Sequence, residues 1–468
     1  MNSCKVLLIY PNAHGFSRIP LGMSIISTCL KQAGHQVRLF DTTFDKSTNL
    51  DNAWREKLGI VKKVEIDFLH TIKSEKAIED ALVKLLKGYS PDLILFSIVE
   101  QNLAYATQIM RVIKENYGGI IAAGGVTPTA IPDIIIKNPY VDIVCLGEGE
   151  EVAVELANTI GAGQSFDYIK NLWVKKANGA IIQNPMRPFI DMDKLPIQDV
   201  GIFDDRHLAK PFDGRIVRTT GVEMSRGCPN KCHFCANERA QQMLASCGTY
   251  HREKSIEKSV EEMRVLKDEF KLDMMFFNDE NFLMMSEKRF NDFYKMYKKE
   301  VGIPFYIQTR VETVTDYKAK KLKELDCATV GMGVESGSEK LRKTVLNRYM
   351  TNQQIIDGFC KIHSVGIRTT SNNMLGFPTE TKRDILDTIK INKIIQPKSL
   401  ELCYLVPYAG TRLHDLCVVL KLIPDGLVQN LSLREQTVLN FPKSHKKFLE
   451  KVFSNFSKYV SGELELPN

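Results

Sequence analysis

The sequence lacks several features that would place it in a common class of protein. It has no apolar run long enough to cross a bilayer, and its first apolar stretch, residues 6–10, is too short for a signal peptide. It contains no internal repeat and no low-complexity tract. These absences predict a cytoplasmic, globular protein, and 468 residues are enough for two or three domains with cores of their own.

The charge and the cysteine content exclude further classes of protein. Sixty-three basic and 56 acidic residues leave a net charge of +7, which is modest for this length and does not by itself indicate nucleic-acid binding. Eleven cysteines without an export signal indicate a reducing compartment rather than a disulfide framework. Eight of these cysteines are scattered, several within apolar runs, so we expect them to pack in cores.

The remaining three cysteines form a C-x3-C-x2-C cluster of Cys228, Cys232 and Cys235. Three thiolates so close together can bind three irons of a 4Fe–4S cube and leave the fourth iron open to a substrate. The alternative is a structural zinc site with His233 or His251 as fourth ligand. Such zinc sites usually pair two knuckles, and the sequence has no second knuckle. The spacing therefore favours an iron–sulfur cluster.

The first 160 residues or so alternate short apolar runs with helical patterns. Runs of four to seven apolar residues, separated by helices, are typical of a parallel sheet covered on both faces. Right-handed crossovers then predict a doubly wound, Rossmann-like domain. The expected strands are residues 5–10, 36–40, 92–98, 119–123 and 142–146. A long, charged insertion, residues 45–88, separates the second of these strands from the third.

The second half of the chain predicts a different architecture. A hairpin at 171–175 and 180–183 is followed by a proline-punctuated linker. Alternating strand and helix patterns then predict an open, partial (β/α)6 barrel, with ligands at the carboxyl ends of its strands. The expected strands are residues 216–224, 273–277, 304–308, 328–333, 368–375 and 399–405. The apolar stripe within 448–460 predicts a helix packed on the barrel, in preference to one lying on a membrane.

With its cysteine loop and five further segments in the same order, the chain resembles the radical S-adenosylmethionine (SAM) enzymes over residues 215–411. The segments are Asn278–Phe282, Gln308–Arg310, Gly333–Ser338, Asn373–Glu380 and Pro407–Thr411. In that family the open iron binds SAM, so the resemblance implies a 4Fe–4S cluster on the three cysteines. It also implies the SAM-binding residues Phe234, Asp279, Glu280, Arg310, Glu335, Ser336 and Gly376. The planar guanidinium of Arg310 suits a bidentate contact with the SAM carboxylate.

The first domain resembles the cobalamin-binding domain that precedes the barrel in one branch of this family. The implied cobalamin-binding residues are Asn12, Leu21, Gly22, Ser97, Gly124, Gly125, Thr127, Thr129, Gly147, Glu148, Gly149 and Glu150. Small residues at the carboxyl ends of a parallel sheet open a crevice where a nucleotide tail can enter. The alternative is a generic Rossmann domain that binds another nucleotide or none, but a G-x-G-x-x-G fingerprint for NAD is absent.

The chain departs from many cobalamin proteins at one motif. It has no D-x-H-x-x-G sequence, whose histidine ligates cobalt from below. His14 stands in the first loop without the flanking Asp and Gly of that motif. The branch that this chain resembles commonly lacks the histidine, so cobalamin stays the prediction and the lower axial ligand of cobalt stays unassigned.

The resemblance implies four regions and a reaction. We expect a cobalamin-binding domain at 1–185, a linker at 186–214, the radical SAM barrel at 215–411 and a helical region at 412–468. The implied activity is cobalamin-dependent methylation of an unactivated carbon with two SAM per turnover. A cyclisation or rearrangement without methyl transfer, and a non-catalytic iron–sulfur or cobalamin sensor, are the alternatives. The catalytic residues stay unassigned.

The resemblance also implies partners. A small-molecule or peptide substrate and an external reductant such as flavodoxin or ferredoxin are expected, with no nucleic acid and no transmembrane segment. No motif identifies the substrate. We expect the 45–88 insertion and the C-terminal stretch to determine it.

Overall fold

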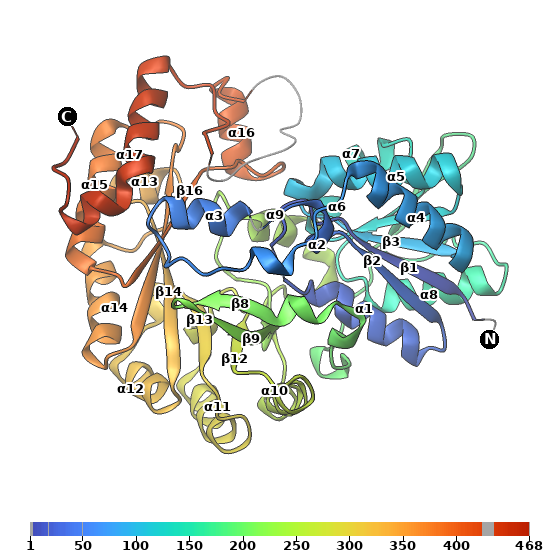
Figure 1. Ribbon diagram of the computed structural model, residues 1–468, viewed down its shortest axis with the longest axis horizontal. Helices are drawn as coiled ribbons and strands as arrows, with labels where there is room; N and C mark the ends of the chain where they lie inside the picture. Colours follow the sequence, from blue (N-terminus) through green and yellow to red (C-terminus); the bar gives the residue numbers. More distant parts are fainter. Residues whose placement is uncertain (1–2, 17, 49, 424–434, 468) are drawn as a thin grey trace. The chain divides into compact units, whose positions relative to one another are not determined.

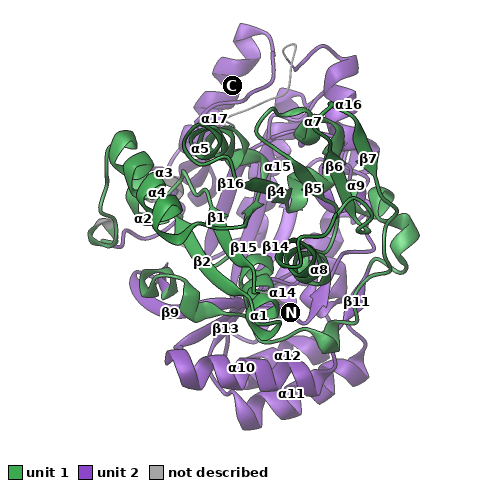
Figure 2. Cartoon of the chain, turned by 90° about the vertical axis from the view of Figure 1, so that its right-hand side faces the viewer, with its two compact units in different colours: residues 1–50, 65–208, 239–250 green, residues 51–64, 209–238, 251–468 purple. Residues whose placement is uncertain are grey.

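The structure is a computed structural model that describes residues 3–16, 18–48, 50–423 and 435–467. Residues 424–434 of the expected helical region therefore lie outside the described residues. The chain divides into two compact units, coloured separately in Figure 2. Unit 1 comprises residues 1–50, 65–208 and 239–250, and unit 2 comprises residues 51–64, 209–238 and 251–468. Each unit thus takes in a short segment from a distant part of the sequence.

Unit 1 is built on a seven-stranded sheet in the order β2-β1-β3-β4-β5-β6-β7. The first five strands are parallel, and β6 and β7 extend the sheet as an antiparallel hairpin, as predicted. Strand order reverses at β1 and β3, which is the topological switch point where doubly wound sheets bind ligands. The strands are β1 Lys5–Tyr10, β2 Gln36–Asp41, β3 Leu93–Ser97, β4 Ile120–Gly124, β5 Ile143–Cys145, β6 Leu172–Lys175 and β7 Ile181–Gln183.

Helices cover both faces of this sheet, because its strands are apolar on both sides. Helix α1 packs beside α8, and α4 packs beside α5 (Figure 1). The helices of this unit are α1 Leu21–Gln32, α2 Thr43–Lys46, α4 Glu75–Tyr89, α5 Leu103–Asn116, α6 Val126–Ala130, α7 Pro132–Lys137 and α8 Glu150–Gly161. The doubly wound fold is confirmed, and the predicted strands agree with the observed ones to within one residue at either end.

Unit 2 contains a second seven-stranded sheet, in the order β16-β15-β14-β13-β12-β9-β8. Six of its strands are parallel, and β8 pairs antiparallel with β9 at one edge. The sheet does not close, so β16 and β8 are its two edges and the partial barrel is confirmed. The strands are β8 Ala209–Phe212, β9 Arg215–Val222, β12 Met274–Phe277, β13 Phe305–Thr309, β14 Cys327–Glu335, β15 Arg368–Leu375 and β16 Ser399–Tyr404.

The helices of unit 2 follow the strands along the chain, and several begin at side-chain caps. Thr351 and Thr381 each form a capping box with the residue three positions on, which fixes the starts of α14 and α15. The helices are α10 Ile256–Phe270, α11 Glu287–Glu300, α12 Asp316–Glu324, α13 Glu339–Thr344, α14 Asn352–Ser364, α15 Lys382–Ile395, α16 Arg412–Val419 and α17 Lys443–Ser461. A short ribbon, β10 Ser225–Arg226 with β11 Arg252–Glu253, and α9 Ala236–Met243 flank the cysteine loop.

Helix α17 packs on the barrel, as its apolar stripe predicted. Its buried residues join an apolar cluster with α15 and β16, and the rings of Tyr404 and Phe453 stack at 4.0 Å. Its lysines are exposed, except for the half-buried Lys446. Among the described residues, no helix is both long and apolar enough to span a bilayer.

Residues 51–64, which we call the wall segment, connect the two edges of the barrel sheet. The segment begins within helix α3, Leu50–Lys57, and its Leu58 and Ile60 pack in the apolar cluster that contains β16. Farther along, Lys62 Nζ lies 2.9 Å from Asp213 Oδ1 in the turn between β8 and β9. Figure 1 shows this blue segment beside β16 and continuing toward β8. Part of the 45–88 insertion therefore covers the open side of the barrel.

Candidate active site

The three clustered cysteines lie on the loop that follows β9, at the carboxyl end of the strand. Each sulfur has a different side-chain N–H beside it. Asn230 donates to Cys228 at 3.3 Å, Arg310 donates to Cys232 at 3.4 Å, and Asn237 donates to Cys235 at 3.6 Å. Hydrogen bonds to cysteine sulfur are one of the ways in which proteins tune iron–sulfur clusters. The donors around this loop therefore suit a cluster held by three thiolates.

Burial raises the pKa of Cys232 and raises that of Cys235 to about 12. Both thiols are therefore protonated until a metal displaces the proton. Among the described residues, no three His, Cys, Asp or Glu side chains converge to hold a single metal ion. The cysteines of a cubane bind different irons and need not converge on one point.

The loop is anchored at its start and in its middle. His251, one of the two candidate zinc ligands, bonds through Nδ1 to the carbonyl of Gly227 at 2.9 Å. His233, the other, bonds through Nδ1 to the carbonyl of Val345 at 3.0 Å, and its own carbonyl accepts from Leu413 N at 3.0 Å. Both histidines thus hold the backbone of the loop in place. The bond from Leu413 joins the loop to helix α16, which follows the Pro407–Thr411 segment.

The two adjacent acidic residues after β12 have different surroundings. Asp279 is buried and accepts from Met224 N at 3.1 Å and from Ser225 Oγ at 2.5 Å, directly before the cysteine loop. Burial raises the pKa of Asp279 to about 6, and the hydrogen bond from Ser225 opposes this. Glu280 is exposed, and its charge acts on Cys235. Asp279 therefore supports the loop, whereas Glu280 can reach a ligand.

Arg310, which directly follows β13, is the residue predicted to bind the SAM carboxylate. Besides donating to Cys232, it donates to Glu312 through Nη2 at 2.6 Å. The ion pair holds the guanidinium beside the Cys232 sulfur. The remaining N–H groups of the guanidinium are available to a carboxylate. Glu312 was not identified from the sequence, because a glutamate two residues after an arginine is usually a surface residue.

The Gly333–Ser338 segment, which includes the end of β14, is held by two buried arginines. Glu335 has the left-handed φ of 63°, and Arg348 pairs with its carboxylate at 3.4 Å and donates to the carbonyl of Gly333 at 2.8 Å. Arg342, which is fully buried, donates to the carbonyl of Ser336 at 2.5 Å. Burial raises the pKa of Glu335, and Arg348 opposes it.

Neither Arg342 nor Arg348 was identified from the sequence. Arginine is mostly an exposed residue, and no spacing distinguishes a buried one. The turn that they hold contains two of the predicted SAM-binding residues. Of these, Ser336 is fully buried and lies 3.4 Å from Thr388 Oγ1 of α15.

Phe234 and Gly376 lie on neighbouring parts of the barrel mouth. Phe234 packs against an apolar cluster that includes Phe377, Leu405 and Leu439. The Gly376 N–H donates to Glu380 Oε2 at 2.6 Å, so the buried carboxylate of Glu380 holds the turn after β15. Burial raises the pKa of Glu380 to about 8, against the effect of the Gly376 and Phe377 N–H donors.

The raised pKa of Glu380 predicts a pH-dependent stability difference. The folded protein holds this proton more tightly than the unfolded chain, so the free energy of unfolding falls as the pH rises from 4.5 to about 8. Glu380→Gln keeps an oxygen acceptor but cannot ionise. We therefore expect the variant to gain stability over the wild type in urea denaturation as the pH is raised from 5.5 to 8.5. Glu261→Gln, at an exposed position on α10, is the control, and a difference that does not change with pH would contradict the assignment.

In unit 1, the predicted cobalamin-binding residues gather at the carboxyl edge of the sheet, after β1, β3, β4 and β5. Gly125 has a φ of 108°, and a Cβ there would lie 2.9 Å from the carbonyl oxygen of Ile98, so this turn requires glycine. The Oγ1 of Thr129 donates to the Gly125 carbonyl and accepts from Gly147 N, both at 2.9 Å. The loops after β4 and β5 are thereby joined into one rim.

Other predicted cobalamin-binding residues at this edge of the sheet also make contacts within unit 1. Glu148 accepts from Ile190 N at 2.9 Å, and Glu150 and Thr127 are buried. Leu244, of the short segment that follows the cysteine loop, lies 3.0 Å from the Cβ position of Gly147. Of the remaining predicted residues, Leu21 and Gly22 begin α1, while Ser97 and Gly124 end β3 and β4. Of the residues that the structure describes, none comes within 4 Å of the Cβ position of Gly22.

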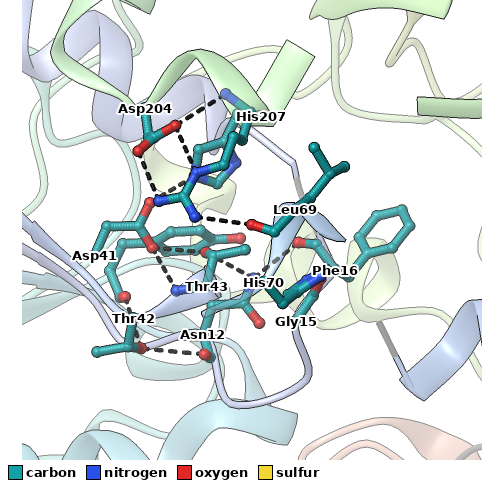
Figure 3. Close-up of polar contacts among 12 residues, drawn as sticks. Asn12, Gly15, Phe16, Asp41, Thr42, Thr43, Leu69, His70, Asp204 and His207 are labelled. Carbon is teal, nitrogen blue, oxygen red and sulfur yellow. Dashed lines mark hydrogen bonds and ion pairs between the residues drawn. The ribbon is translucent and has the colours of Figure 1, made fainter. Parts of the chain in front are cut away.

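The first loop is supported by a polar network that the sequence did not reveal (Figure 3). Asn12 donates through Nδ2 to Phe16 O at 2.8 Å and to Thr43 Oγ1 at 3.1 Å. Thr43 donates to Asp41 Oδ1 at 2.6 Å, and Asp41 Oδ2 lies 2.5 Å from His207 Nε2. Asn12 is therefore tied to the end of β2, and through Asp41 to the linker residue His207.

Comparison with known proteins agrees with both units. The B12 binding domain family matches residues 14–157, and the Radical SAM superfamily matches residues 222–391. The chain therefore contains a B12-binding domain followed by a radical SAM domain, as the resemblance predicted.

Individual relatives extend over most of the chain. An uncharacterized methyltransferase of Pyrococcus horikoshii is 24% identical over 98% of this chain and 93% of its own length. An anaerobic magnesium-protoporphyrin IX monomethyl ester cyclase of Rubrivivax gelatinosus is 23% identical over 68% of this chain and 57% of its own. The structure of the radical SAM methyltransferase TsrM of Kitasatospora setae, with cobalamin and a [4Fe–4S] cluster bound, has a TM-score of 0.67 at 16% identity. It covers 89% of this chain and 75% of that one.

Proposed function

We propose that this protein is a cobalamin-dependent radical SAM methyltransferase that acts on an unactivated carbon atom. The observation that carries the proposal is the cysteine loop of unit 2, in which each sulfur has its own N–H donor, in a chain that also has a cobalamin-binding domain. The methyltransferase relative that spans nearly the whole chain supports transfer of a methyl group. When bound, the cluster with SAM supplies radical chemistry, and cobalamin supplies the methyl carrier.

The residues of unit 2 have separate roles in this proposal. Cys228, Cys232 and Cys235 hold three irons, and Asp279 fixes the backbone that leads into their loop. Glu280 accepts a hydrogen bond from the amino group of SAM, and Arg310 donates its free N–H groups to the SAM carboxylate. Glu335, Ser336, Gly376 and Phe234 line the nucleoside. Arg348 and Arg342 position the Glu335 turn and do not touch the reacting atoms.

Unit 1 holds cobalamin in this proposal. The rim formed by Gly125, Thr129 and Gly147 and the loop supported by Asn12 receive it at the switch point of the sheet. Glycine at position 125 allows the backbone to approach a bulky ligand without a side chain in the way. The other predicted cobalamin-binding residues at this edge of the sheet border the cobalamin as well.

The proposal is tested by the stoichiometry of turnover. Radical generation and methyl donation are separate uses of SAM, so each methylated product should come with one 5′-deoxyadenosine and one S-adenosylhomocysteine. With methyl-deuterated SAM, mass spectrometry should show a trideuteromethyl group on the product, and substrate deuterium should appear in 5′-deoxyadenosine.

Cyclisation without methyl transfer is the second candidate, favoured by the cyclase among the relatives. The same experiment separates the two. A product with an unchanged carbon count, formed with 5′-deoxyadenosine but without S-adenosylhomocysteine, would establish the cyclisation and refute methyl transfer.

A further inference from the structure

The wall segment places the charged side chain of Arg55 against the barrel sheet. Arg55, on α3, pairs through Nη2 with the carboxylate of Glu401 on β16. Leu400, Leu402 and Tyr404 of the same strand face the apolar cluster beneath α17. Side chains alternate along a strand, so Glu401 points to the opposite face of the sheet, the inner face of the partial barrel. The Arg55 guanidinium is therefore held at the inner face.

The Arg55–Glu401 pair lies at the level of the proposed SAM site. In the strand register, Glu401 is opposite Asn372, and Asn372 is opposite Gly333. The residue before Gly333 is opposite Thr309, which directly precedes Arg310. The pair is thus in the same layer of the sheet as the turn after β14 and the arginine beside Cys232. Ligands of such barrels bind at this end of the strands.

Arg55 retains unused hydrogen-bonding capacity. A guanidinium has five N–H donors in a planar fork, and the contact with Glu401 uses Nη2. The Nε of Arg55 is buried and has no hydrogen-bond partner among the described residues. The side chain is 24% exposed, so a ligand can reach it. A guanidinium that has free N–H donors and lies at the carboxyl ends of the barrel strands is suited to bidentate binding of an oxyanion.

We propose that Arg55 and Glu401 form the substrate-recognition pair of this enzyme, and that Arg55 binds a carboxylate or phosphate group of the substrate. The inference rests on the proposed function, because it assigns the substrate class of the same site. Glu401 holds the guanidinium in position and competes with the incoming anion for it. Part of the insertion between β2 and β3 thereby supplies a specificity residue to the barrel.

A purely structural ion pair makes a different prediction from a recognition pair. If the pair only attaches the wall segment, then removing either partner weakens that attachment and creates no affinity for anions. If Arg55 binds an anion in competition with Glu401, the two substitutions act in opposite directions. Arg55→Ala removes the binding group, whereas Glu401→Gln removes its competitor.

The test uses the full chain, with cluster and cobalamin, and S-adenosylhomocysteine to occupy the SAM site. The cluster is photoreduced with a flavin sensitiser and an amine electron donor, so that it is paramagnetic and no anionic reductant is present. Inorganic phosphate and 13C-labelled acetate are the probes, and their relaxation is measured by 31P and 13C nuclear magnetic resonance. Lys57→Ala, which removes a cation from the same helix, is the matched control. Arg55→Lys keeps the charge and the attachment to Glu401 but loses the planar fork.

We expect saturable relaxation enhancement of at least one probe in the wild type and in Lys57→Ala. The affinity should fall at least tenfold in Arg55→Ala, fall less in Arg55→Lys, and rise severalfold in Glu401→Gln. Phosphate alone would indicate a phosphorylated substrate, and acetate alone a carboxylate. Absence of saturation in the wild type, unchanged affinity in Arg55→Ala, or no gain in Glu401→Gln would each overturn the proposal. Formation of S-adenosylhomocysteine and 5′-deoxyadenosine tests the proposed function separately.

Discussion

Cys232→Ala protein is expected to form no 5′-deoxyadenosine from SAM under reducing conditions, and the same holds for Cys228→Ala and Cys235→Ala. Each substitution removes one of three protein ligands, so the cluster loses an iron or is not assembled. Wild-type protein reconstituted without oxygen should contain about four iron and four sulfide per chain. The expected loss is complete because generation of the radical depends on the cluster.

Two other cysteines serve as controls for this experiment. Cys360 is exposed on α14 and Cys247 is buried in unit 1, and both lie outside the loop. Alanine at either position should leave the iron content and SAM cleavage unchanged. Wild-type levels of 5′-deoxyadenosine in Cys232→Ala would show that the cluster is held elsewhere.

Substitution of the two adjacent carboxylates after β12 should produce different defects. In Glu280→Gln, the cluster should form normally while the dissociation constant for SAM rises about tenfold to a hundredfold. This is the effect of losing a charge-assisted hydrogen bond of about 1.5–3 kcal/mol. In Asp279→Ala, the Met224 N–H and the Ser225 hydroxyl lose their acceptor, so the backbone leading into the cysteine loop is no longer fixed. We expect a reduced iron content in that variant.

Iron analysis and SAM binding by isothermal titration distinguish the two roles. Glu287→Gln, at an exposed position at the start of α11, is the control for loss of a negative charge near this strand. Tight SAM binding by Glu280→Gln, together with a full cluster in Asp279→Ala, would refute the division of roles.

Much of the architecture was predictable because both sheets are regular. The apolar runs of a parallel sheet are continuous, and the intervening helices are amphipathic, so β1 and β15 were predicted at their observed bounds. The cysteine spacing and the segments at the strand ends are local in sequence, and they identified the radical SAM barrel. Shorter elements, such as the β10–β11 ribbon and helix α13, were not predicted because two to six residues carry no clear periodicity.

The supporting residues of the site were not predictable in the same way. Arg348 and Arg342 contact the Glu335 turn only because α13 and the following loop return to it. Asp279 was predicted to bind SAM, and in the fold its carboxylate supports the strand next to it. Such roles depend on which backbone groups come within hydrogen-bond distance, and the sequence does not state that distance.

The sequence by itself determined the two folds, and it predicted the cluster cysteines and the strand ends where ligands are expected, because periodicity and motif spacing are local properties. Only the tertiary structure decided which side chains support these ligands and which are able to contact them. It also decided the place of the wall segment. Residues 51–64 are in the N-terminal half of the sequence, yet Leu58 and Ile60 bury their side chains against the barrel, and Arg55 pairs with Glu401. Contacts between residues more than 300 positions apart arise from burial of apolar surface in the folded chain, and no local pattern records them.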